Sequence, residues 1–213
     1  MPGSREISRV PRIDIPRKSI YRLSIYQRCL GKLRENDVDT VSSEALAKAA
    51  GVKPTQLRKD LAYFGQFGTR GLGYSVDILS ATISEVLGHN RLQPVILVGV
   101  GNLGSALLRY GGFRKEGFEV VAAFDVSPKQ QANLSIPILA ITEMGEFIRS
   151  NQVKMAILAV PASAAQSVTN QMVEAGIQAV LNFSPSVLDV PEHVVVNSVD
   201  LAVELENLSY FIR

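Results

Sequence analysis

The sequence predicts an α/β protein in which a small helical domain precedes a larger domain built on a doubly wound parallel sheet. Three observations support this. Helical apolar periodicity and a glycine-rich stretch occupy the first 84 residues. Beyond them, short apolar runs alternate with amphipathic helical segments, as in a parallel sheet buried on both faces. The glycine turn "GVGNLG" at 99–104 lies between the first such run and the first such helix.

The composition is that of an ordinary globular protein, and it excludes several classes. A chain of 213 residues is long enough for one large or two small domains. Its apolar runs fall short of the roughly 18 residues typical of a membrane span, and its N-terminus lacks the apolar core of a signal peptide. Cys29 is the only cysteine, which excludes a disulfide within the chain and a cysteine-rich zinc site. We therefore expect a cytoplasmic protein without a metal site.

Basic residues gather at the front of the chain. Residues 1–84 hold 14 Lys and Arg against 8 Asp and Glu, whereas residues 85–213 hold 8 against 12. The whole chain has a net charge of only +2. An excess of positive charge on one domain favours a polyanionic partner such as nucleic acid, and the alternative is a merely solvated basic face.

The first domain has the element order of a winged helix-turn-helix. Residues 1–16, with three prolines and three arginines, predict a flexible basic arm, and apolar residues spaced by three and four predict a helix over 17–34. A second helix is capped by Ser42 or Ser43, and a third begins at Pro54 and runs to about Phe64. Glycines at 65, 68, 71 and 73 then predict a tight hairpin, the wing.

The helix that begins at Pro54 predicts a DNA-reading surface. Leu57, Leu61 and Phe64 form its inward stripe, so Arg58 and Lys59 face outward beside small residues. Arginine reads guanine through two hydrogen bonds, and lysine contacts a base or a phosphate. The alternative is a solvated basic helix. The residues expected to contact DNA, including the arm and the wing, are Arg12, Arg17, Lys18, Thr55, Gln56, Arg58, Lys59, Gln66, Thr69 and Arg70.

A linking helix and a repeated strand–helix pattern complete the chain. The linking helix is expected over 77–88, capped by Asp77, with Ile78, Ile83, Val86 and Leu87 on its apolar side. At the C-terminus, an amphipathic helix presents the stripe Leu201, Leu205, Leu208 and Ile212. Between them, strands are expected at 95–99, 119–124, 155–160, 179–183 and 194–196, and helices at 104–113 and 164–176.

The glycine turn has the context of a dinucleotide site, because Gly99, Gly101 and Gly104 follow a strand and open a helix. Such glycines permit the tight turn, the approach of a pyrophosphate and the packing of the helix on the strand. Asp125 ends the next strand, 21 residues after Gly104, where a carboxylate accepts the ribose hydroxyls of NAD. The alternative is a Rossmann-like domain whose glycines serve packing alone.

The strand ends that follow offer no His, Lys, Cys or acidic residue for hydride chemistry. We therefore expect no enzymatic activity. An apolar pocket of Val160, Pro161, Ala162 and Phe183 favours the neutral ring of NADH over the cationic ring of NAD+ without any catalytic group.

The segments "LRKDLAYFGQFGTRGLGY" (57–74), "GVGNLGSAL" (99–107), "LAVPA" (158–162) and "LNFSP" (181–185) together resemble the Rex family of redox-sensing transcriptional repressors. The resemblance runs from about Ile15 to the C-terminus. It implies a homodimer that binds a palindromic DNA operator when NADH is low and leaves it when NADH binds. It also implies that the last helix swaps between protomers.

The resemblance assigns the dinucleotide site and the domain order. One departure from the family pattern lies after the ribose-binding acid: Pro128 and Lys129 are kept, but Ser127 and Gln131 stand where the family often has an acid and a glycine. The resemblance therefore does not fix the affinity at the adenosine end or the NADH concentration at which the protein responds. An NAD-dependent oxidoreductase and a CoA-binding protein remain the alternatives.

The implied domains are a basic arm (1–16), a winged helix (17–84), a Rossmann domain (85–200) and a dimerisation helix (201–213). The implied NAD(H)-binding residues are Gly99, Val100, Gly101, Asn102, Leu103, Gly104, Asp125, Val126, Lys129, Val160, Pro161, Ala162 and Phe183.

Overall fold

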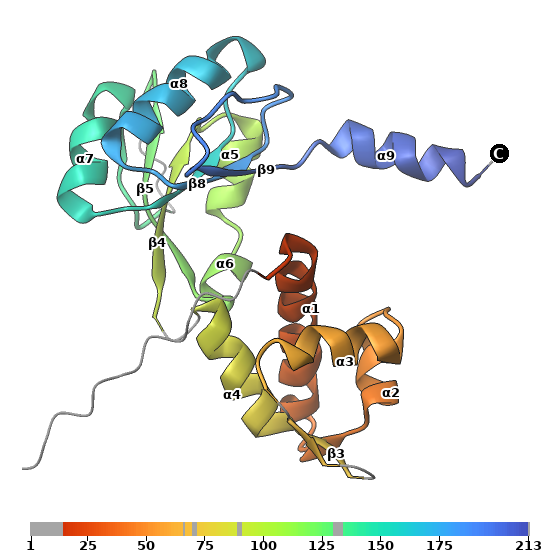
Figure 1. Ribbon diagram of the computed structural model, residues 1–213. Coiled ribbons are helices and arrows are strands. Elements are labelled where there is room, and N and C mark those ends of the chain that lie inside the picture. The colour runs from red at the N-terminus through yellow and green to blue at the C-terminus, as the bar shows by residue number, and fades with distance from the viewer. Residues whose placement is uncertain (1–14, 66, 70–71, 89–90, 130–133, 213) are drawn as a thin grey trace, which may run out of the picture. The chain divides into compact units, whose positions relative to one another are not determined.

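The computed structural model describes residues 15–65, 67–69, 72–88, 91–129 and 134–212 of the chain. The chain divides into two compact units, Met1–Asn90 and Arg91–Arg213 (Figure 1). Most of the expected basic arm lies outside the described residues.

The first unit is a winged helix-turn-helix, as predicted. Its small antiparallel sheet has the strand order β1-β3-β2. Strand β1 was not expected from the sequence, and it pairs Thr40 with Ser75 and Val41 with Tyr74 of the wing. The elements are α1 (Arg17–Glu35), β1 (Thr40–Val41), α2 (Ser43–Ala49), α3 (Pro54–Ala62), β2 (Gly68–Thr69), β3 (Gly73–Ser75) and α4 (Val76–Leu87).

The linking helix α4 corrects two expectations. Its N-terminal cap is Ser75, whose side chain accepts a hydrogen bond from the N–H of Ile78, so Asp77 is not the cap. The buried side of α4 begins two residues earlier than expected, and Val86, expected on that side, is 37% exposed. Val76, Leu79 and Ile83 are buried, whereas Ile78 is 62% exposed. Val76, Leu79 and Ile83 share one helical face, and Ile78, two residues after Val76, lies on the opposite face.

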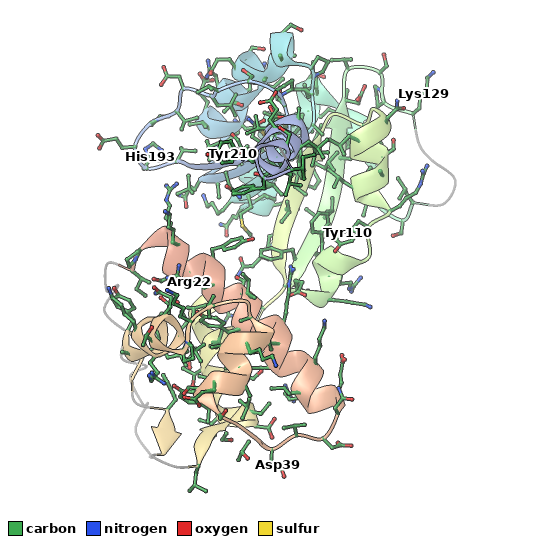
Figure 2. All side chains as sticks on the ribbon, turned by 90° about the vertical axis from the view of Figure 1, so that its right-hand side faces the viewer. Arg22, Asp39, Tyr110, Lys129, His193 and Tyr210 are labelled. Atoms are coloured by element: carbon green, nitrogen blue, oxygen red, sulfur yellow. The ribbon has the colours of Figure 1, made fainter. Side chains whose placement is uncertain are left out.

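Buried Asp60 ties helix α3 to helix α1. Its carboxylate accepts hydrogen bonds from Arg22 Nε at 2.5 Å, Arg22 Nη2 at 2.7 Å and the Tyr26 hydroxyl at 2.8 Å (Arg22 is labelled in Figure 2). Gln56 of α3 donates a fourth hydrogen bond, at 2.9 Å. Burial acts to raise the pKa of Asp60, but the hydrogen bonds from Arg22, Tyr26 and Gln56 outweigh it and hold that pKa below its ordinary value.

The second unit is a Rossmann-type domain, again as predicted. Its six strands are all parallel, in the order β6-β5-β4-β7-β8-β9, and this order reverses its direction at β4. The strands are β4 (Gln93–Val98), β5 (Phe118–Asp125), β6 (Ile138–Ala140), β7 (Met155–Leu158), β8 (Ala179–Asn182) and β9 (Val195–Ser198). The helical elements are α5 (Asn102–Leu108), α6 (Gly112–Lys115), the 3-10 turn η1 (Ile141–Glu143), α7 (Met144–Asn151), α8 (Ala162–Ala175) and α9 (Leu201–Tyr210).

Helices cover both faces of this sheet (Figure 1). On one face, Met144 of α7 and Met172 of α8 pack with Phe124 of β5. On the other, Leu107 of α5 and Phe113 of α6 pack with residues of β4 and β5. The sheet is therefore buried on both sides, which accounts for its nearly continuous apolar runs.

Two segments of the second unit differ from the expectation. The helix expected over 104–113 is two helices, α5 and α6, separated near Gly111. Strand β6 and helix α7 were not expected at all. With three residues, β6 is too short to show a periodic pattern.

The C-terminal helix α9 is exposed along its whole length. Asp200 caps it by accepting hydrogen bonds from the N–H groups of Ala202 and Val203. Leu201, Leu205 and Leu208 are 62%, 68% and 63% exposed. An apolar stripe this exposed is unusual for the surface of a folded domain. No helix in the described part of the chain is long and apolar enough to cross a membrane.

Asp60→Asn should destabilise the first unit by about 2–3 kcal/mol, because Arg22 loses the carboxylate that its guanidinium contacts twice. Hydrogen exchange of the full chain, read by mass spectrometry, should show faster exchange in α1 and α3 and no change in the Rossmann-type unit. Asp77→Asn is the control, since the Arg34–Asp77 pair that it breaks is exposed. Unchanged protection of α1 and α3 would contradict the role given to Asp60.

The same substitution predicts a pH dependence. A carboxyl whose pKa is lowered by folding stabilises the fold fully above its unfolded-state pKa, about 4, and loses this contribution as the pH falls through the folded value. The stability difference between the natural chain and Asp60→Asn should therefore be constant from pH 7 to 5 and narrow below about pH 4. Urea denaturation of both chains at several pH values checks this, and a constant difference down to pH 3 would refute it.

Candidate functional site

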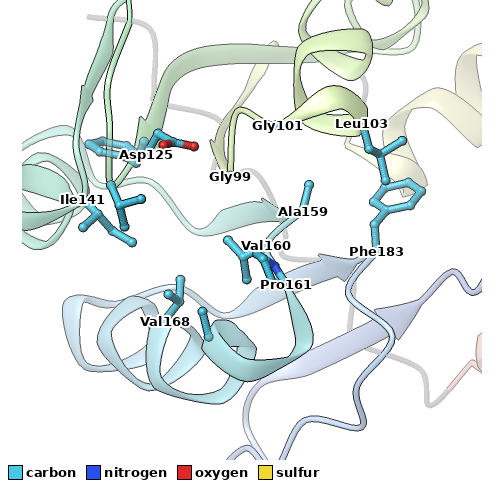
Figure 3. Close-up of a pocket in the computed structure, with 13 residues that line it drawn as sticks. Gly99, Gly101, Leu103, Asp125, Ile141, Ala159, Val160, Pro161, Val168 and Phe183 are labelled. Atoms are coloured by element: carbon cyan, nitrogen blue, oxygen red, sulfur yellow. The ribbon is translucent and has the colours of Figure 1, made fainter.

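A cavity of about 560 Å³ lies at the carboxyl edge of the sheet, beside the ends of β4, β5 and β7 (Figure 3). The strand order reverses at β4, so its neighbours β5 and β7 leave it in opposite directions. Open α/β sheets bind ligands in the crevice at this topological switch point. The position of the cavity alone therefore marks it as the candidate binding site.

Three glycines shape the turn beside the cavity, of which Gly99 and Gly101 line it, and each acts in a different way. Gly99 has a φ of +96°, and a Cβ there would overlap the carbonyl of Ala159 at the end of β7. A Cβ on Gly104 would overlap the carbonyl oxygen of Gly99. At Gly101, by contrast, no atom lies within 4 Å of an added Cβ. Gly99 and Gly104 are therefore required by the turn itself, and Gly101 leaves open space at the N-terminus of α5.

Asp125 holds the glycine turn in place. Its Oδ2 accepts a hydrogen bond from the N–H of Val100 at 2.7 Å, and its Oδ1 accepts one from the N–H of Ser127 at 2.9 Å. The sequence predicted a ligand contact for this carboxylate and did not predict these bonds. Each oxygen keeps a lone pair, so Asp125 can still accept a hydroxyl of a ligand.

The cavity has two ends (Figure 3). Asp125 and Ile141 lie at one end, Leu103 and Phe183 at the other, and Val160 between them. Among the described residues, Asp125 is the only charged one in the lining. Of the residues expected to bind NAD(H), the cavity is lined by Gly99, Gly101, Leu103, Asp125, Val126, Val160, Pro161 and Phe183.

Several residues expected to bind NAD(H) do not line the cavity, and several residues that line it were not expected. Lys129, labelled in Figure 2, is exposed and does not line the cavity. Ile141 follows strand β6, so no pattern in the sequence could place it. Val100, Asn102, Gly104 and Ala162 also lie outside the lining, while Phe124, Ile141, Ala159, Ala164 and Val168 belong to it without having been expected.

Buried Asn182 positions the loop that carries Phe183. Its side-chain amide donates hydrogen bonds to the carbonyl of Ser186 at 3.0 Å and to the hydroxyl of Ser198 at 3.2 Å. Its Oδ1 accepts a hydrogen bond from the N–H of Ser184 at 2.9 Å. The amide thus ties strand β8, the loop and strand β9 together, which fixes the backbone at Phe183.

The candidate DNA surface lies on α3 of the first unit. Leu57 and Leu61 are buried, as expected, and Thr55, Arg58 and Lys59 are exposed on the opposite side. Gln56 is half-buried, because it donates its hydrogen bond to Asp60.

The other residues of that prediction are only partly described. Arg17 and Lys18 are exposed in the first turn of α1, and Thr69 belongs to β2 of the wing. Arg12, Gln66 and Arg70 lie outside the described residues, as does Gln131 of the Rossmann-type unit. Within the described chain, no three His, Cys, Asp or Glu side chains are close enough to hold a metal ion.

Comparison with known families matches both units. Residues 90–186 match the family model described as "CoA binding domain". Residues 14–62 match the model described as "Putative DNA-binding protein N-terminus".

Curated relatives match nearly the whole chain. The "Redox-sensing transcriptional repressor Rex" of Syntrophobacter fumaroxidans is 49% identical over 200 residues, which cover 92% of this chain and 95% of that protein. The protein of the same name from Streptomyces coelicolor is 46% identical over 92% of this chain and 77% of its own length.

Solved structures match equally broadly. RSP, a Rex-family repressor, in complex with β-NAD+ and operator DNA, is similar with a TM-score of 0.87 and 34% identity, covering 94% of both chains. RSP in complex with β-NADH gives a TM-score of 0.83 and 33% identity, covering 94% of this chain and 95% of that one.

The glycine geometry predicts different outcomes for two alanine substitutions. Gly101→Ala should leave the melting temperature of the ligand-free protein unchanged, because its φ of −71° suits alanine and the added Cβ meets no atom. It should weaken NADH binding about tenfold, or about 1.4 kcal/mol, because the Cβ enters the space that a pyrophosphate would use.

Gly104→Ala should instead destabilise the ligand-free domain by about 1–3 kcal/mol, because its Cβ overlaps a backbone carbonyl. Thermal melts without ligand and NADH fluorescence titrations separate the two effects. Full NADH affinity in Gly101→Ala would show that the ligand does not approach this turn.

Proposed function

This chain belongs to the Rex family of redox-sensing transcriptional repressors, and we propose that it binds operator DNA when NADH is low and releases it when NADH binds. One observation carries the proposal: a winged helix-turn-helix and a cavity at a glycine turn with an acid at the next strand end occur in one chain. The relative RSP has been solved with β-NAD+ and operator DNA, and with β-NADH.

We place the dinucleotide along the cavity. Its pyrophosphate lies over the open space at Gly101, next to the first N–H groups of α5. The adenosine ribose binds at Asp125, whose carboxylate keeps acceptor capacity, and the adenine lies near Ile141. The nicotinamide then reaches Leu103 and Phe183 at the far end.

The far end of the cavity favours the reduced ring. NAD+ carries a positive charge on its nicotinamide and NADH does not. Leu103, Val160 and Phe183 offer no anion to a cationic ring, and removing that ring from water costs free energy that the neutral ring does not incur. The lining therefore supports a preference for NADH that requires no chemical step.

We propose that the chain is a regulator and has no enzymatic activity. Of the lining residues that the structure describes, Asp125 alone is charged, and both its oxygens accept backbone hydrogen bonds. Hydride transfer to a substrate needs an acid or base beside the nicotinamide, and the described lining supplies none there. A DNA-binding repressor that reads NADH acts in the cytoplasm, which is the location we propose.

Helix α9 supports a homodimer as the working form. Its leucine stripe is unpartnered within one described chain, and a second copy of the chain would bury it, by the helix exchange that the family resemblance implied. A dimer would also present two copies of α3, as a palindromic operator requires. NADH must then weaken DNA binding by the same factor by which DNA weakens NADH binding.

A CoA ligand is the second candidate, because residues 90–186 match the CoA-binding family model. Asp125 at the ribose position favours NAD(H), since CoA carries a phosphate on its ribose and a carboxylate repels it. Competition between CoA and NADH for the cavity separates the two ligands.

Fluorescence anisotropy tests the proposed function. The full chain first selects its preferred duplex from a randomised library, and that duplex is labelled. We expect NADH to weaken binding by about 5- to 150-fold, equivalent to about 1–3 kcal/mol of coupling, at concentrations where NAD+ does not. If NADH leaves operator binding unchanged but CoA weakens it, CoA is the sensed ligand. If no duplex is preferred, the protein is not a sequence-specific repressor.

Leu205→Glu combined with Leu208→Glu should convert the dimer to a monomer while both domains stay folded, because these side chains are exposed in the single chain. Sedimentation velocity measures the change, and operator affinity should fall with it. Glu204→Gln on the same helix is the control. Persistence of the dimer in the double variant would place the interface elsewhere.

A further inference from the structure

Arg58, the arginine expected to read DNA, has two polar partners on the neighbouring helix α2. Its Nη1 donates a hydrogen bond to the hydroxyl of Ser43 at 3.0 Å and lies 3.6 Å from Oε1 of Glu44. Both partners sit in the first turn of α2, which packs beside α3 (Figure 1). The guanidinium is thus held across the two helices of the helix-turn-helix.

This contact adds little to the stability of the fold. The side chain of Arg58 is 50% exposed and that of Glu44 is 70% exposed, and ion pairs this exposed are nearly neutral for stability because water screens them. The anionic form of Glu44 is nonetheless favoured. Its pKa is lowered by its own backbone N–H at the start of α2, with smaller contributions from Ser43 and Arg58.

The pair also lies next to the wing. Strand β1 ends at Val41, which pairs with Tyr74 of β3, and the chain then enters α2 at Ser43. The ring of Tyr74 packs over Gly68 of β2, since a Cβ on Gly68 would lie 3.0 Å from it. The first turn of α2, which carries Ser43 and Glu44, therefore follows directly after a strand that is paired with the wing.

A carboxylate on a DNA-binding surface has two opposing effects. It repels phosphates and cancels the charge of Arg58, which lowers affinity for every sequence alike. It also restricts a long side chain before DNA arrives, so that less conformational entropy is lost when the guanidinium meets a base edge. The repulsion of phosphates lowers affinity for all DNA, whereas the smaller loss of conformational entropy helps only where Arg58 contacts a base edge.

We propose that Glu44 is a positioning residue for Arg58 that sets sequence specificity. It holds the guanidinium for base reading and suppresses its use as a non-specific phosphate contact. This inference rests on the proposed function, because it requires Arg58 to contact the operator.

Glu44→Gln tests the proposal by separating specific from non-specific binding. The full-length protein is titrated against the duplex that it selects from a randomised library and against a scrambled duplex of equal length, over a range of salt concentrations. We expect affinity for the scrambled duplex to rise several-fold, and its salt dependence to steepen by close to one phosphate contact, about 0.9 in the log–log slope. Affinity for the selected duplex should rise less, so the ratio of the two affinities falls.

Asp77→Asn is the matched control. It also removes one exposed carboxylate from an ion pair of the same domain, with Arg34 at 3.0 Å, and it does not touch Arg58. If Asp77→Asn changes the affinity ratio and the salt slope as much as Glu44→Gln does, overall charge explains the effect and the proposal is wrong. Circular dichroism confirms that each variant is folded.

Arg58→Gln separates this inference from the proposed function. In an Arg58→Gln background, adding Glu44→Gln should leave the affinity ratio unchanged, because Glu44 acts through Arg58. If Arg58→Gln alone leaves binding of the selected duplex intact, Arg58 does not read DNA and the premise itself fails. If it weakens that binding while Glu44→Gln acts equally in both backgrounds, only the positioning role is refuted.

Discussion

The Rossmann-type unit depends on two positions of the glycine turn, Gly99 and Gly104, at which no side chain fits. The end of β4 passes so close to Ala159 after β7 that Gly99 has no room for a Cβ, and α5 begins so close to the turn that Gly104 has none either. The bond from Val100 N–H to Asp125 then anchors the turn to the end of β5. The carboxyl ends of β4, β5 and β7 are therefore held together at one edge of the sheet, and the cavity lies beside Gly101 at that edge.

Polar contacts also hold the helices of the first unit together, and α1 makes such contacts with both α3 and α4. Arg22 and Tyr26 on one side of α1 hold Asp60 of α3. On another side, Gln27 donates hydrogen bonds to the hydroxyls of Ser80 at 3.0 Å and Ser84 at 2.8 Å on α4. Helices α3, α1 and α4 are thereby linked by directed bonds as well as by apolar packing. Because α4 leads to the Rossmann-type unit, this arrangement favours α3 moving with α4 rather than independently of it.

Local patterns predicted the fold well because its strongest signals are local. Helical periodicity identified α1 and α3, and the glycine spacing together with Asp125 identified the turn and the carboxylate beside the cavity. Strands β1 and β6 were missed, because two or three residues carry no period. The cap of α4 was misassigned by two residues, since serine and aspartate are both good caps. The Arg22–Asp60 contact spans 38 positions, and the lining residue Ile141 depends on the unexpected β6, so neither follows from spacing in the sequence.

The exposed leucine stripe of α9 predicts that repression depends on the concentration of the protein itself. The proposed dimer would form by mass action, so the fraction of chains able to bind both halves of a palindrome would fall when the protein is dilute. A cell that makes few copies would therefore lose repression even when NADH is scarce. Gene dosage and growth dilution would then enter the regulatory response alongside the redox state, through a helix that lies outside both α3 and the lining of the cavity.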